Sequence, residues 1–450
     1  TCGPFNNPGW EQCDYTAIPS DSITMTSQAD VENFQTTYGG GGTCDTVTGS
    51  LIISGSDISD LTPLSALIAV GSIPSDDLEI TNNSVLTNLN GLSSVTTLQS
   101  LWITDNAMLA NIDGLSALTS ASGLLAVSGN NSLLNVDGLS SLTTAPSLGI
   151  SSNNSLTNVD GLSSLTSTDF ALQIFRNNSL VSLTGLSSLT SVGGHLAIQE
   201  NPLLTSLNGL ENLVSVGWSG FTQGLTASRN DSLMNVDALS SLVSVEGNID
   251  ISLNSALTNL DGLSALIYAG NNVRVDQNPA LASCNGLRTL LDDIDDGVPG
   301  PGPGPSGIPD VGGDVVLEGN LSGCNSVAEA LAYVCTSENI TLASQADVDA
   351  FQSTYGDGGT CDTVTRTLRI SGADITDLSP LSALINVDAL VISDNPNLTN
   401  IDGLSALTSV GYLAVDYNAA LTNLDGLSGL SSTGRSFHIR FNPVLTDITG

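Results

Sequence analysis

Residues Leu189–Leu210 read LTSVGGHLAIQENPLLTSLNGL, and this phrase recurs with small changes along nearly the whole chain. Its Gly-Leu step returns after 23 or 24 residues, except in one longer interval of 29 residues. A repeat of roughly 20 to 50 residues is typical of solenoids, in which each repeat forms one coil. The steps stand at Gly91, Gly114, Gly138, Gly161, Gly185, Gly209, Gly262, Gly286, Gly403, Gly426 and Gly450, with Ala238 in the equivalent place once.

Each repeat contains one short segment of the type Leu-x-Ile, which predicts a single strand. One strand per repeat cannot form a hairpin, but it can pair in parallel with the strand of the next coil. Its apolar flanks would then point inward. We therefore expect a mainly β fold, a right-handed parallel β-solenoid. The predicted strands are Leu51–Ile53, Leu78–Ile80, Leu101–Ile103, Leu125–Val127, Leu148–Ile150, Leu172–Ile174, Leu196–Ile198, Leu225–Ala227, Ile249–Ile251, Val273–Val275, Leu368–Ile370, Leu390–Ile392, Leu413–Val415 and Phe437–Ile439.

An asparagine stands three places after most of these strands. A polar residue at one fixed phase of a solenoid predicts an internal ladder, whose amides satisfy backbone groups that would cost about 1–3 kcal/mol if buried without a partner. The predicted ladder is Asn83, Asn106, Asn130, Asn153, Asn177, Asn201, Asn230, Asn254, Asn278, Asn395, Asn418 and Asn442.

The chain also repeats on a larger scale, because residues 22–38 return as residues 339–355 and CDTVT returns at Cys44 and Cys361. The segment Ser-Gln-Ala-Asp-Val predicts a short helix with Ser27 or Ser344 near its N-cap. Alternating proline after Asp295 predicts an extended connector. We expect a first cap at 1–50, a first solenoid at 51–294, a linker at 295–323, a second cap at 324–367 and an unfinished second solenoid at 368–450. Because Gly450 stands in mid-repeat, we expect either further chain or another subunit stacked there.

The seven cysteines lie at the ends of the modules, which favours disulfides in an oxidising compartment over a zinc site. One pattern joins Cys13 to Cys44, Cys335 to Cys361 and Cys284 to Cys324. It leaves Cys2 for a bond to another chain. The rival pattern joins Cys2 to Cys13 and Cys324 to Cys335, and the sequence does not choose between them.

The phrase at Leu189–Leu210 and the cap CDTVTGSLIISGSDISDLTPL at Cys44–Leu64 resemble the bacterial extracellular leucine-rich repeat proteins related to receptor L domains. The resemblance covers nearly all of the chain except the linker. It implies a right-handed solenoid used for recognition, adhesion or surface architecture, without catalysis. It carries over no binding residue, because such proteins share no ligand motif.

Charge excludes some partners. The net charge is −37, lysine is absent, and all eight cations are arginines. Nucleic acid and anionic membrane surfaces need basic patches that this chain lacks. No apolar run is long enough to cross a bilayer as a helix. The chain starts as a processed secreted protein would, so we expect an extracellular location, with any export signal already removed.

Motifs for catalysis are not recognisable. The two histidines, His195 and His438, fall in different modules, so a shared site is not expected. No nucleophile elbow or phosphate loop is present. The periodic aspartates favour a turn role over catalysis. The densest acidic run, Asp292, Asp293, Asp295 and Asp296, is a weak calcium candidate, the one cofactor considered. The periodic aspartates are Asp113, Asp137, Asp160, Asp261, Asp402 and Asp425.

The repeat varies mainly at the middle of Leu-x-Ile and at the two residues after it. These positions point outward and predict an interaction face that gathers five arginines, suited to an acidic neighbour or a carboxylated glycan. The alternative is tolerated surface variation. The face comprises Trp102, Phe175, Arg176, Arg229, Arg274, Arg369 and Arg440. Asn320, Asn339 and Asn397, which we place off the ladder, are the glycosylation candidates.

The expected function is an extracellular structural or adhesive repeat protein that assembles with copies of itself, head to tail, into a surface array or filament. The alternative is a module that binds glycans or receptors through the strand face. An ice-binding face is a third reading, because Thr87, Thr157 and Thr205 share a phase, although Ala110, Asn135 and Ser182 break the series. A polysaccharide-degrading solenoid is the fourth.

Overall fold

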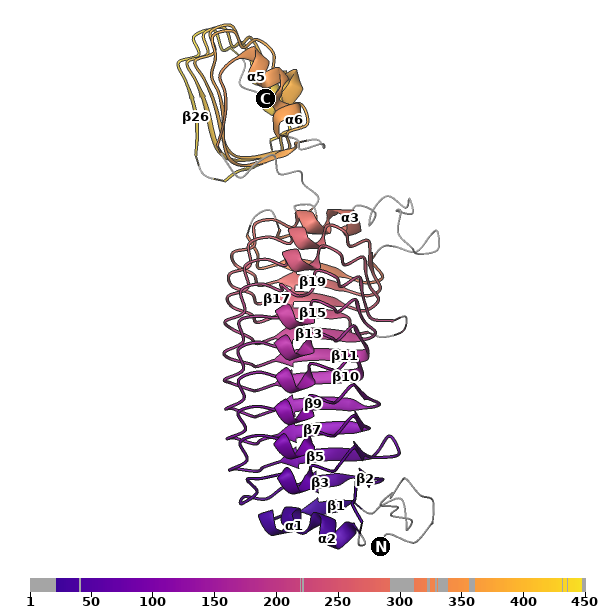
Figure 1. The fold of residues 1–450 in the computed structure, drawn as a ribbon. Coiled ribbons are helices and arrows are strands. Elements are labelled where there is room, and N and C mark those ends of the chain that lie inside the picture. The colour runs from indigo at the N-terminus through magenta and orange to yellow at the C-terminus, as the bar shows by residue number, and fades with distance from the viewer. Residues whose placement is uncertain are drawn as a thin grey trace. The chain divides into compact units, whose positions relative to one another are not determined.

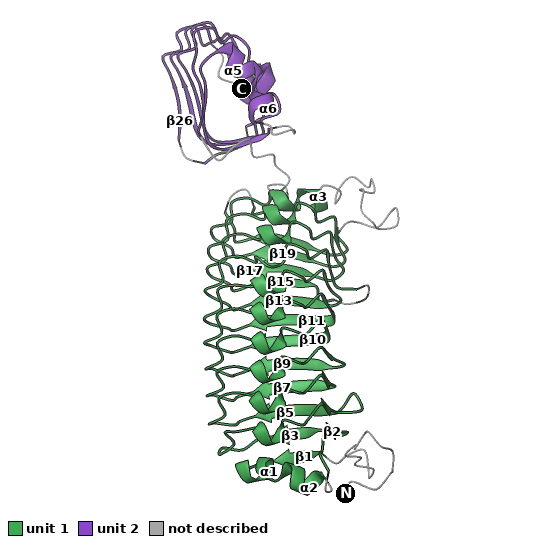
Figure 2. Cartoon of the chain, viewed as in Figure 1, with its two compact units in different colours: residues 1–330 green, residues 331–450 purple. Residues whose placement is uncertain are grey.

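The computed structural model describes residues 22–39, 42–218, 220, 222–291, 311–321, 324–327, 330, 339–355, 361–430, 432–434 and 436–446. The chain forms two compact units, Thr1–Ala330 and Leu331–Gly450, which are coloured separately in Figure 2.

Unit 1 is a stack of coils whose described strands all pair in parallel (Figure 1). In the first row, Leu101 of one strand faces Leu78 of the coil before and Leu125 of the coil after. The predicted parallel solenoid of leucine-rich repeat type is confirmed. The first row comprises β1 (Ile23–Met25), β3 (Leu51–Ile53), β5 (Asp77–Thr81), β7 (Ser100–Thr104), β9 (Leu124–Ser128), β10 (Thr144–Ser151), β11 (Ser167–Phe175), β13 (His195–Gln199), β15 (Leu225–Ser228), β17 (Ile249–Ser252), β19 (Val273–Asp276) and β20 (Val315–Glu318).

A second row of two-residue strands runs beside the first, and β10 and β11 are long enough to belong to both rows. The remaining strands of this row are β2 (Thr46–Val47), β4 (Ala69–Val70), β6 (Thr97–Leu98), β8 (Ser120–Ala121), β12 (Ser191–Val192), β14 (Ser215–Val216), β16 (Ser244–Val245) and β18 (Tyr268–Ala269).

A column of 3-10 helices forms another side of the coil, as Figure 1 shows. These helices are η1 (Thr62–Leu64), η2 (Asn90–Leu92), η3 (Asp113–Leu115), η4 (Asp137–Leu139), η5 (Asp160–Leu162), η6 (Thr184–Leu186), η7 (Asp237–Leu239), η8 (Asp261–Leu263) and η9 (Asn285–Leu287).

The core fills the inside of the coil and consists almost entirely of aliphatic side chains. Leu101 and Ile103 are fully buried, whereas Trp102 between them is 36% exposed. This alternation is the inward and outward pattern that the sequence predicts for a strand. Burying a leucine-sized side chain contributes about 1.5–3 kcal/mol. The stack of apolar residues is therefore the main source of stability.

The asparagine ladder lies inside the coil, next to the first row. Asn130 accepts the backbone N–H of Asn106 on its Oδ1 at 3.1 Å and donates from its Nδ2 to the carbonyl of Ile103 at 2.8 Å. Its own backbone N–H donates to the Oδ1 of Asn153 at 3.0 Å. Every ladder asparagine from Asn83 to Asn278 is fully buried and bonded in this way. Each of these asparagines therefore ties together three successive coils, through its side chain to the coil before and through its backbone N–H to the coil after.

Glycine at the Gly-Leu step is required by the closeness of neighbouring coils. A Cβ built on Gly161 would lie 1.9 Å from the carbonyl oxygen of Val136. Ala238 occupies this place in one coil only. In the coil before it, residues 208–209 form a turn instead of a 3-10 helix, and Gly209 has a φ of +114°. The backbone of the coil that faces Ala238 therefore differs from that of the other coils.

The N-terminal cap is made of α1 (Gln28–Glu32) and α2 (Phe34–Tyr38), which lie against the first coil (Figure 1). Ser27 is the N-cap of α1, and its hydroxyl accepts the backbone N–H of Asp30 in a capping box, as predicted. The cap also contributes strand β1, which pairs with β3. The solenoid therefore starts inside the segment that the sequence assigned to the cap.

The predicted linker at 295–323 needs a correction. Val311 bridges Ala269 of the second row, and β20 pairs with β19. The backbone N–H of Leu321 donates to Leu281 at 2.9 Å. Residues 311–321 therefore form most of a further coil of unit 1. Residues 292–310 lie outside the described part. After η9, the short helix α3 (Arg288–Leu291) buries Leu290 and Leu291 at this end.

Unit 2 repeats the plan with fewer coils. Ser344 is the N-cap of α5 (Gln345–Asp349), which is followed by α6 (Phe351–Tyr355). All pairings among its described strands are parallel. The strands are β21 (Ile340–Leu342), β22 (Thr363–Ile370), β23 (Asn386–Ser393), β24 (Ser409–Asp416), β25 (Ser432–Thr433) and β26 (Phe437–Arg440), and the 3-10 helices are η10 (Ser379–Leu381), η11 (Asp402–Leu404) and η12 (Asp425–Leu427).

The ladder yields a first prediction. Asn153→Ala removes the acceptor of the Asn130 N–H and the donor to Val127, and both groups stay buried. We expect a loss of about 2–4 kcal/mol in the free energy of unfolding of unit 1, measured with urea. Asn154→Ala is the matched control, because Asn154 is exposed and should change stability by less than about 0.5 kcal/mol. Equal effects from the two variants would contradict the role of the ladder.

Glycine spacing yields a second prediction. Gly161→Ala forces a Cβ against backbone and should destabilise unit 1 by about 1–3 kcal/mol in the same measurement. Gly149→Ala is the control, since a Cβ there would meet nothing within 4 Å. It should leave stability unchanged or raise it, by up to about 1 kcal/mol. A Gly161→Ala protein as stable as wild type would show that the coils can move apart.

Candidate functional site

The candidate site consists of two regions, namely the outward face of the first row and the closing end of unit 1. On the face, the middle residues of successive strands point out of the sheet. Trp102 is the largest of them, and its Nε1 donates to the Oδ1 of Asp77 in the coil before at 3.3 Å. This bond to the neighbouring coil holds the indole in place while the ring stays partly exposed.

Arg176, Glu200 and Arg229 lie in three successive coils at the corner that follows the strands. All three have left-handed backbone, with φ between 52° and 58°. The Nε of Arg176 lies 2.8 Å from the Oε2 of Glu200. This hydrogen bond, with the charges of Arg176 and Arg229, holds the pKa of Glu200 below its usual range. The corner is therefore a column of alternating charge.

The predicted face of five arginines is only partly present. Arg274 is paired with Asp276 at 2.7 Å, and Asp276 is fully buried, so this arginine neutralises an internal carboxylate. Arg369 and Arg440 belong to unit 2, where Arg369 donates to Ser393 and Arg440 contacts His438. Arg274 and Arg440 contact residues two places away in their own strands, whereas Arg369 contacts a residue of the next coil. Which arginines stay available on the face therefore depends on the packing of the side chains, which the sequence pattern does not show.

His195 and His438 lie in separate units, as the sequence indicated. The ring of His195 is half-buried between Gln173, at 3.4 Å, and Thr226, at 3.0 Å. Burial lowers the pKa of His195, so its imidazole is neutral at pH 7. His438 packs beside Tyr412 with ring centroids 5.7 Å apart. Both histidines have structural contacts within their own strand faces.

The periodic aspartates sit at the start of the 3-10 helices, where the backbone N–H of Asp137 donates to the Oδ1 of Asn135 at 3.2 Å. The geometry is that of a turn, as predicted. Burial, followed by the charges of Asp113 and Asp160, raises the pKa of Asp137. The pKa of Asp261 is raised for the same reasons, with Asp237 as its charged neighbour. Stacking identical coils therefore brings like charges together.

One exposed aromatic pair escaped the sequence analysis. Phe170 and Trp218 pack edge to face with ring centroids 5.4 Å apart, and both are more than 40% exposed. They come from coils that are not adjacent in sequence, and Gly193 and Gly194 occupy the coil between them. The signal was present in the longer repeat near Trp218, but only the stacking brings Phe170 beside it.

In the structure, the residues aligned with the threonine series differ from those that the sequence suggested. Backbone hydrogen bonds connect Ala110, Leu134, Thr157 and Val181 from coil to coil. The residues that interrupt the threonines are therefore Leu134 and Val181, not Asn135 and Ser182. Both are about half exposed and apolar. A continuous lattice of threonine hydroxyls is absent from this described column.

The glycosylation candidates divide by exposure. Asn320 is not off the ladder, because its Oδ1 accepts the N–H of Asn278 and its Nδ2 donates to Val275 and Cys324. Asn339 and Asn397 are exposed, so a glycan there stays a prediction. Asn82, in the sequon Asn-Asn-Ser, is an exposed left-handed residue that the sequence analysis missed.

The metal candidates Asp292, Asp293, Asp295 and Asp296 lie outside the described residues, and calcium binding there stays a prediction. Across the described part of the chain, no cluster of three or more His, Cys, Asp or Glu side chains is placed to hold a metal ion.

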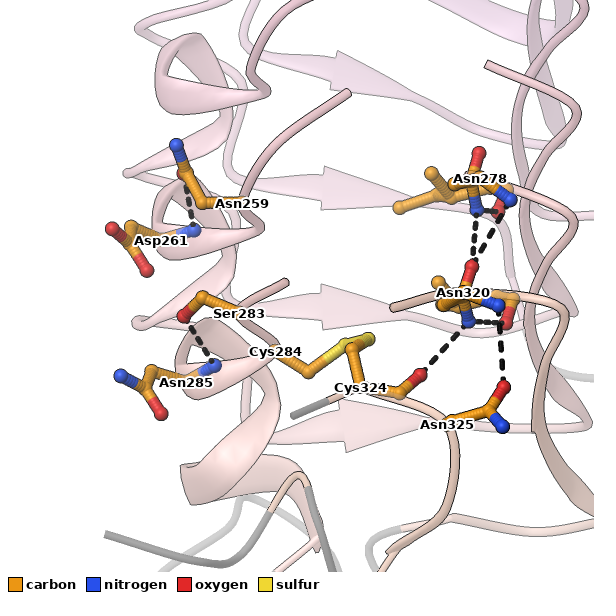
Figure 3. The surroundings of a disulfide bond; sticks show 11 residues. Asn259, Asp261, Asn278, Ser283, Cys284, Asn285, Asn320, Cys324 and Asn325 are labelled. Atoms are coloured by element: carbon orange, nitrogen blue, oxygen red, sulfur yellow. Dashed lines mark hydrogen bonds between the residues drawn. A yellow bond between two sulfur atoms is a disulfide. The ribbon is translucent and has the colours of Figure 1, made fainter. Parts of the chain in front are cut away.

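The closing end of unit 1 carries the disulfide Cys284–Cys324, with a Cα–Cα distance of 5.2 Å (Figure 3). Figure 3 also shows Asn320 continuing the ladder below Asn278, and the backbone N–H of Asn320 donates to Asn325 at 3.2 Å. Cys44 and Cys361 are disulfide-bonded as well. Cys2, Cys13 and Cys335 lie outside the described residues, so their pairing stays a prediction.

Comparison with known proteins finds only distant structural likenesses. Neither a family model nor a curated protein matches the chain. Among solved structures, an internalin from Listeria monocytogenes has 18% identity and a TM-score of 0.39, over 68% of this chain and 75% of that chain. A complex of TLR13 with ssRNA13 has 12% identity and a TM-score of 0.23, over 89% of this chain and 70% of that chain. Likenesses this distant carry no argument about ligands.

The aspartate column yields a third prediction. When the pKa of a carboxyl is raised in the folded state, its charged form destabilises the fold above that pKa. This loss of stability is relieved as the pH falls through the raised pKa and the carboxyl becomes protonated. Asp137→Asn should therefore stabilise unit 1 at pH 7, and the gain should vanish as the pH falls through the raised pKa toward the ordinary value of about 4. Urea midpoints across pH measure this difference.

The matched control is Asp377→Asn. Hydrogen bonds from Ser379 lower the pKa of Asp377, so its charged form contributes stability that is lost as the pH falls through the lowered pKa. This variant should destabilise unit 2 at pH 7. If both variants shift stability in the same direction at pH 7, the electrostatic account of the column is wrong.

Proposed function

We propose that this leucine-rich repeat solenoid is an extracellular structural or adhesive protein that acts without catalysis and assembles with further modules head to tail. The observation that supports this is the closing coil of unit 1. The residues that complete the coil, 311–321 with Cys324, come shortly before the capping helices of unit 2 in sequence. The last coil of one module is thus completed by the segment that leads into the next module.

The cysteines extend this relation beyond the single chain. Cys324 precedes Cys335 by the same step that separates Cys2 from Cys13. Cys324 bonds the tail of the preceding module at Cys284. By analogy, Cys2 is the residue that would bond the tail of a module in another chain. Its role as an intermolecular cysteine belongs to this proposal.

An extracellular location fits the disulfides, which are rare in reducing compartments. Within the described residues, no helix is long and apolar enough to cross a membrane. The net charge of −37 would keep long rods soluble and apart from each other, except where their ends meet.

A second candidate function is ligand binding on the side of unit 1, and the exposed Phe170–Trp218 pair favours it. Two aromatic rings that stay exposed beside a rigid stack offer a platform for the apolar face of a sugar or for a protein loop. A glycan array probed with wild type and with Trp218→Ala separates this candidate from assembly. Trp218→Ala should abolish binding to the glycans and leave the size of the oligomers unchanged.

The assembly proposal is tested by sedimentation and negative-stain imaging of the oxidised full chain. We expect end-to-end oligomers that become shorter in Cys2→Ser, because the covalent link between chains is lost. Trp102→Ala is the control and should assemble as wild type does, since it alters the face and leaves both ends intact. Purely monomeric wild-type protein at high concentration, with Cys2 bonded inside its own chain, would refute the proposal.

A further inference from the structure

We propose that one side of unit 1 is an interface at which two copies of this chain pair side by side, with their stacks running in the same direction. The side face consists of the five residues that follow each ladder asparagine from Asn83 to Asn278. The proposal goes beyond head-to-tail assembly, because it concerns the flank of unit 1 and neither of its ends. The nine segments of the side face are residues 84–88, 107–111, 131–135, 154–158, 178–182, 202–206, 231–235, 255–259 and 279–283.

The side face carries almost no charge, although the chain holds 45 acidic residues. Asp231 is the one charged residue in the nine segments, which otherwise contain Ser, Thr, Asn, Pro and aliphatic residues. Charged residues resume on both borders. One border is the corner column that contains Arg176, Glu200 and Arg229, and the other is the column of aspartates that start the 3-10 helices. A second copy can therefore approach this side without placing like charges in direct contact.

The side face exposes one large aliphatic side chain in six of its first seven coils, and each of them is 45–54% exposed. The remaining coil has Thr157 there, whose backbone is bonded to Leu134 on one side and to Val181 on the other. A continuous row of exposed apolar residues on a soluble protein marks an interaction site more often than chance variation. The six residues are Val85, Met108, Leu134, Val181, Leu203 and Met234.

Backbone hydrogen bonds hold the side face rigid. The N–H of Leu134 donates to Ala110 at 3.2 Å, and the N–H of Val181 donates to Thr157 at 3.0 Å. Beneath the surface, Leu133 and Leu180 are fully buried in the core. A rigid surface has little conformational freedom to lose on binding, so the exposed apolar area contributes more fully to pairing.

The arrangement of large and small residues makes the face complementary to itself. The aliphatic side chains occupy two outward columns, which flank the column of buried leucines. In each of the six coils, one outward position is large and the other is Ala, Ser or Thr, as with Leu134 and Ser132. A two-fold axis along the buried leucine column exchanges the two outward columns. Each large side chain then meets the small residue of the same coil in the other copy, as a symmetric dimer requires.

The charged borders decide the direction of the second stack. If the second copy were inverted, its aspartate border would lie along the aspartate border of the first. If both stacks run the same way, the aspartate border lies along the corner column, and Arg229 shares a coil with Asp237. The other acidic residues still repel each other across the borders, and salt screens this repulsion. Side pairing therefore needs ionic strength, whereas at low salt the flanks stay apart.

The area of the side face is sufficient for a specific dimer. Nine coils at about 4.8 Å each give a height of about 40 Å, and five nearly extended residues give a width of about 15 Å. Each copy would then bury about 600 Å², and the pair about 1,200 Å². Specific interfaces between proteins bury about 1,000 Å² or more in total.

The test measures dimerisation of the full chain with Cys2→Ser by analytical ultracentrifugation in about 0.15 M NaCl. Val181→Asp should weaken pairing about tenfold or more, because the dimer would bury two unpaired carboxylates. Val214→Asp is the matched control, since Val214 is 46% exposed but lies outside the side face, next to β14. It should pair as the parent protein does. Urea midpoints of both variants verify that unit 1 stays folded.

Two outcomes of this experiment overturn the proposal. One is a parent protein that stays monomeric at high concentration, and the other is equal pairing by Val181→Asp and Val214→Asp. Raising the salt from about 0.05 M to about 0.5 M should strengthen pairing several-fold, because it screens the acidic borders. Weaker pairing at higher salt would show that opposite charges hold the copies together, which also contradicts the proposal.

Photo-crosslinking tests the direction of the stacks. A chain with benzoylphenylalanine in place of Ser132 is mixed with isotope-labelled wild-type chain, so that links between copies are recognised by mass. We expect labelling of residues 131–135 in the other copy, and labelling of residues 255–259 when the probe replaces Ala256. An inverted pair would link each probe to a different coil, and that result overturns the arrangement.

Side pairing and head-to-tail assembly fail separately in negative-stain images, because side pairing doubles the width of a rod and end pairing extends its length. Val181→Asp should restore single width without shortening the rods. Long rods of single width under all conditions refute side pairing and leave head-to-tail assembly intact. Short rods of double width do the reverse.

Discussion

The structure depends on one constraint, which is that neighbouring coils must lie about 4.8 Å apart along the whole stack. At this spacing, the buried amide of each ladder asparagine reaches a carbonyl of the coil before it and receives an N–H of that coil's asparagine. The same spacing leaves no room for a Cβ at the Gly-Leu step. Hydrogen bonding and backbone contact thus fix the distance, and the aliphatic core fills what remains inside.

This constraint separates positions that must repeat from positions that are free. Inward residues and the ladder are nearly invariant from coil to coil, whereas the middle residue of each strand changes from Trp102 to Gln173 to Arg274. Stacking aligns each variable position with the same position of the neighbouring coils. The charge and contacts of a side chain there therefore depend on the residues of adjacent coils. The alternating Arg176, Glu200 and Arg229, and the like-charged Asp113, Asp137 and Asp160, are two opposite results of the same geometry.

A one-dimensional stack must also cover its two ends, because a coil buries its core only if another coil or a cap lies on it. The first coils use short helices with serine N-caps. Unit 1 closes with a strand, a final asparagine and a disulfide drawn from the segment ahead of unit 2.

The sequence by itself determined the repeat, the strand positions, the ladder and the duplication of modules, because each depends on a period that a single chain displays. It could not reveal that residues 311–321 form a coil, since their strand follows a proline-rich stretch and lacks the repeat phrase. It also could not reveal that Arg274 neutralises a buried carboxylate or that Phe170 meets Trp218. The first contact depends on which side chains of one strand are buried, and the second joins residues of different coils, so both are decided by how the coils fold and stack.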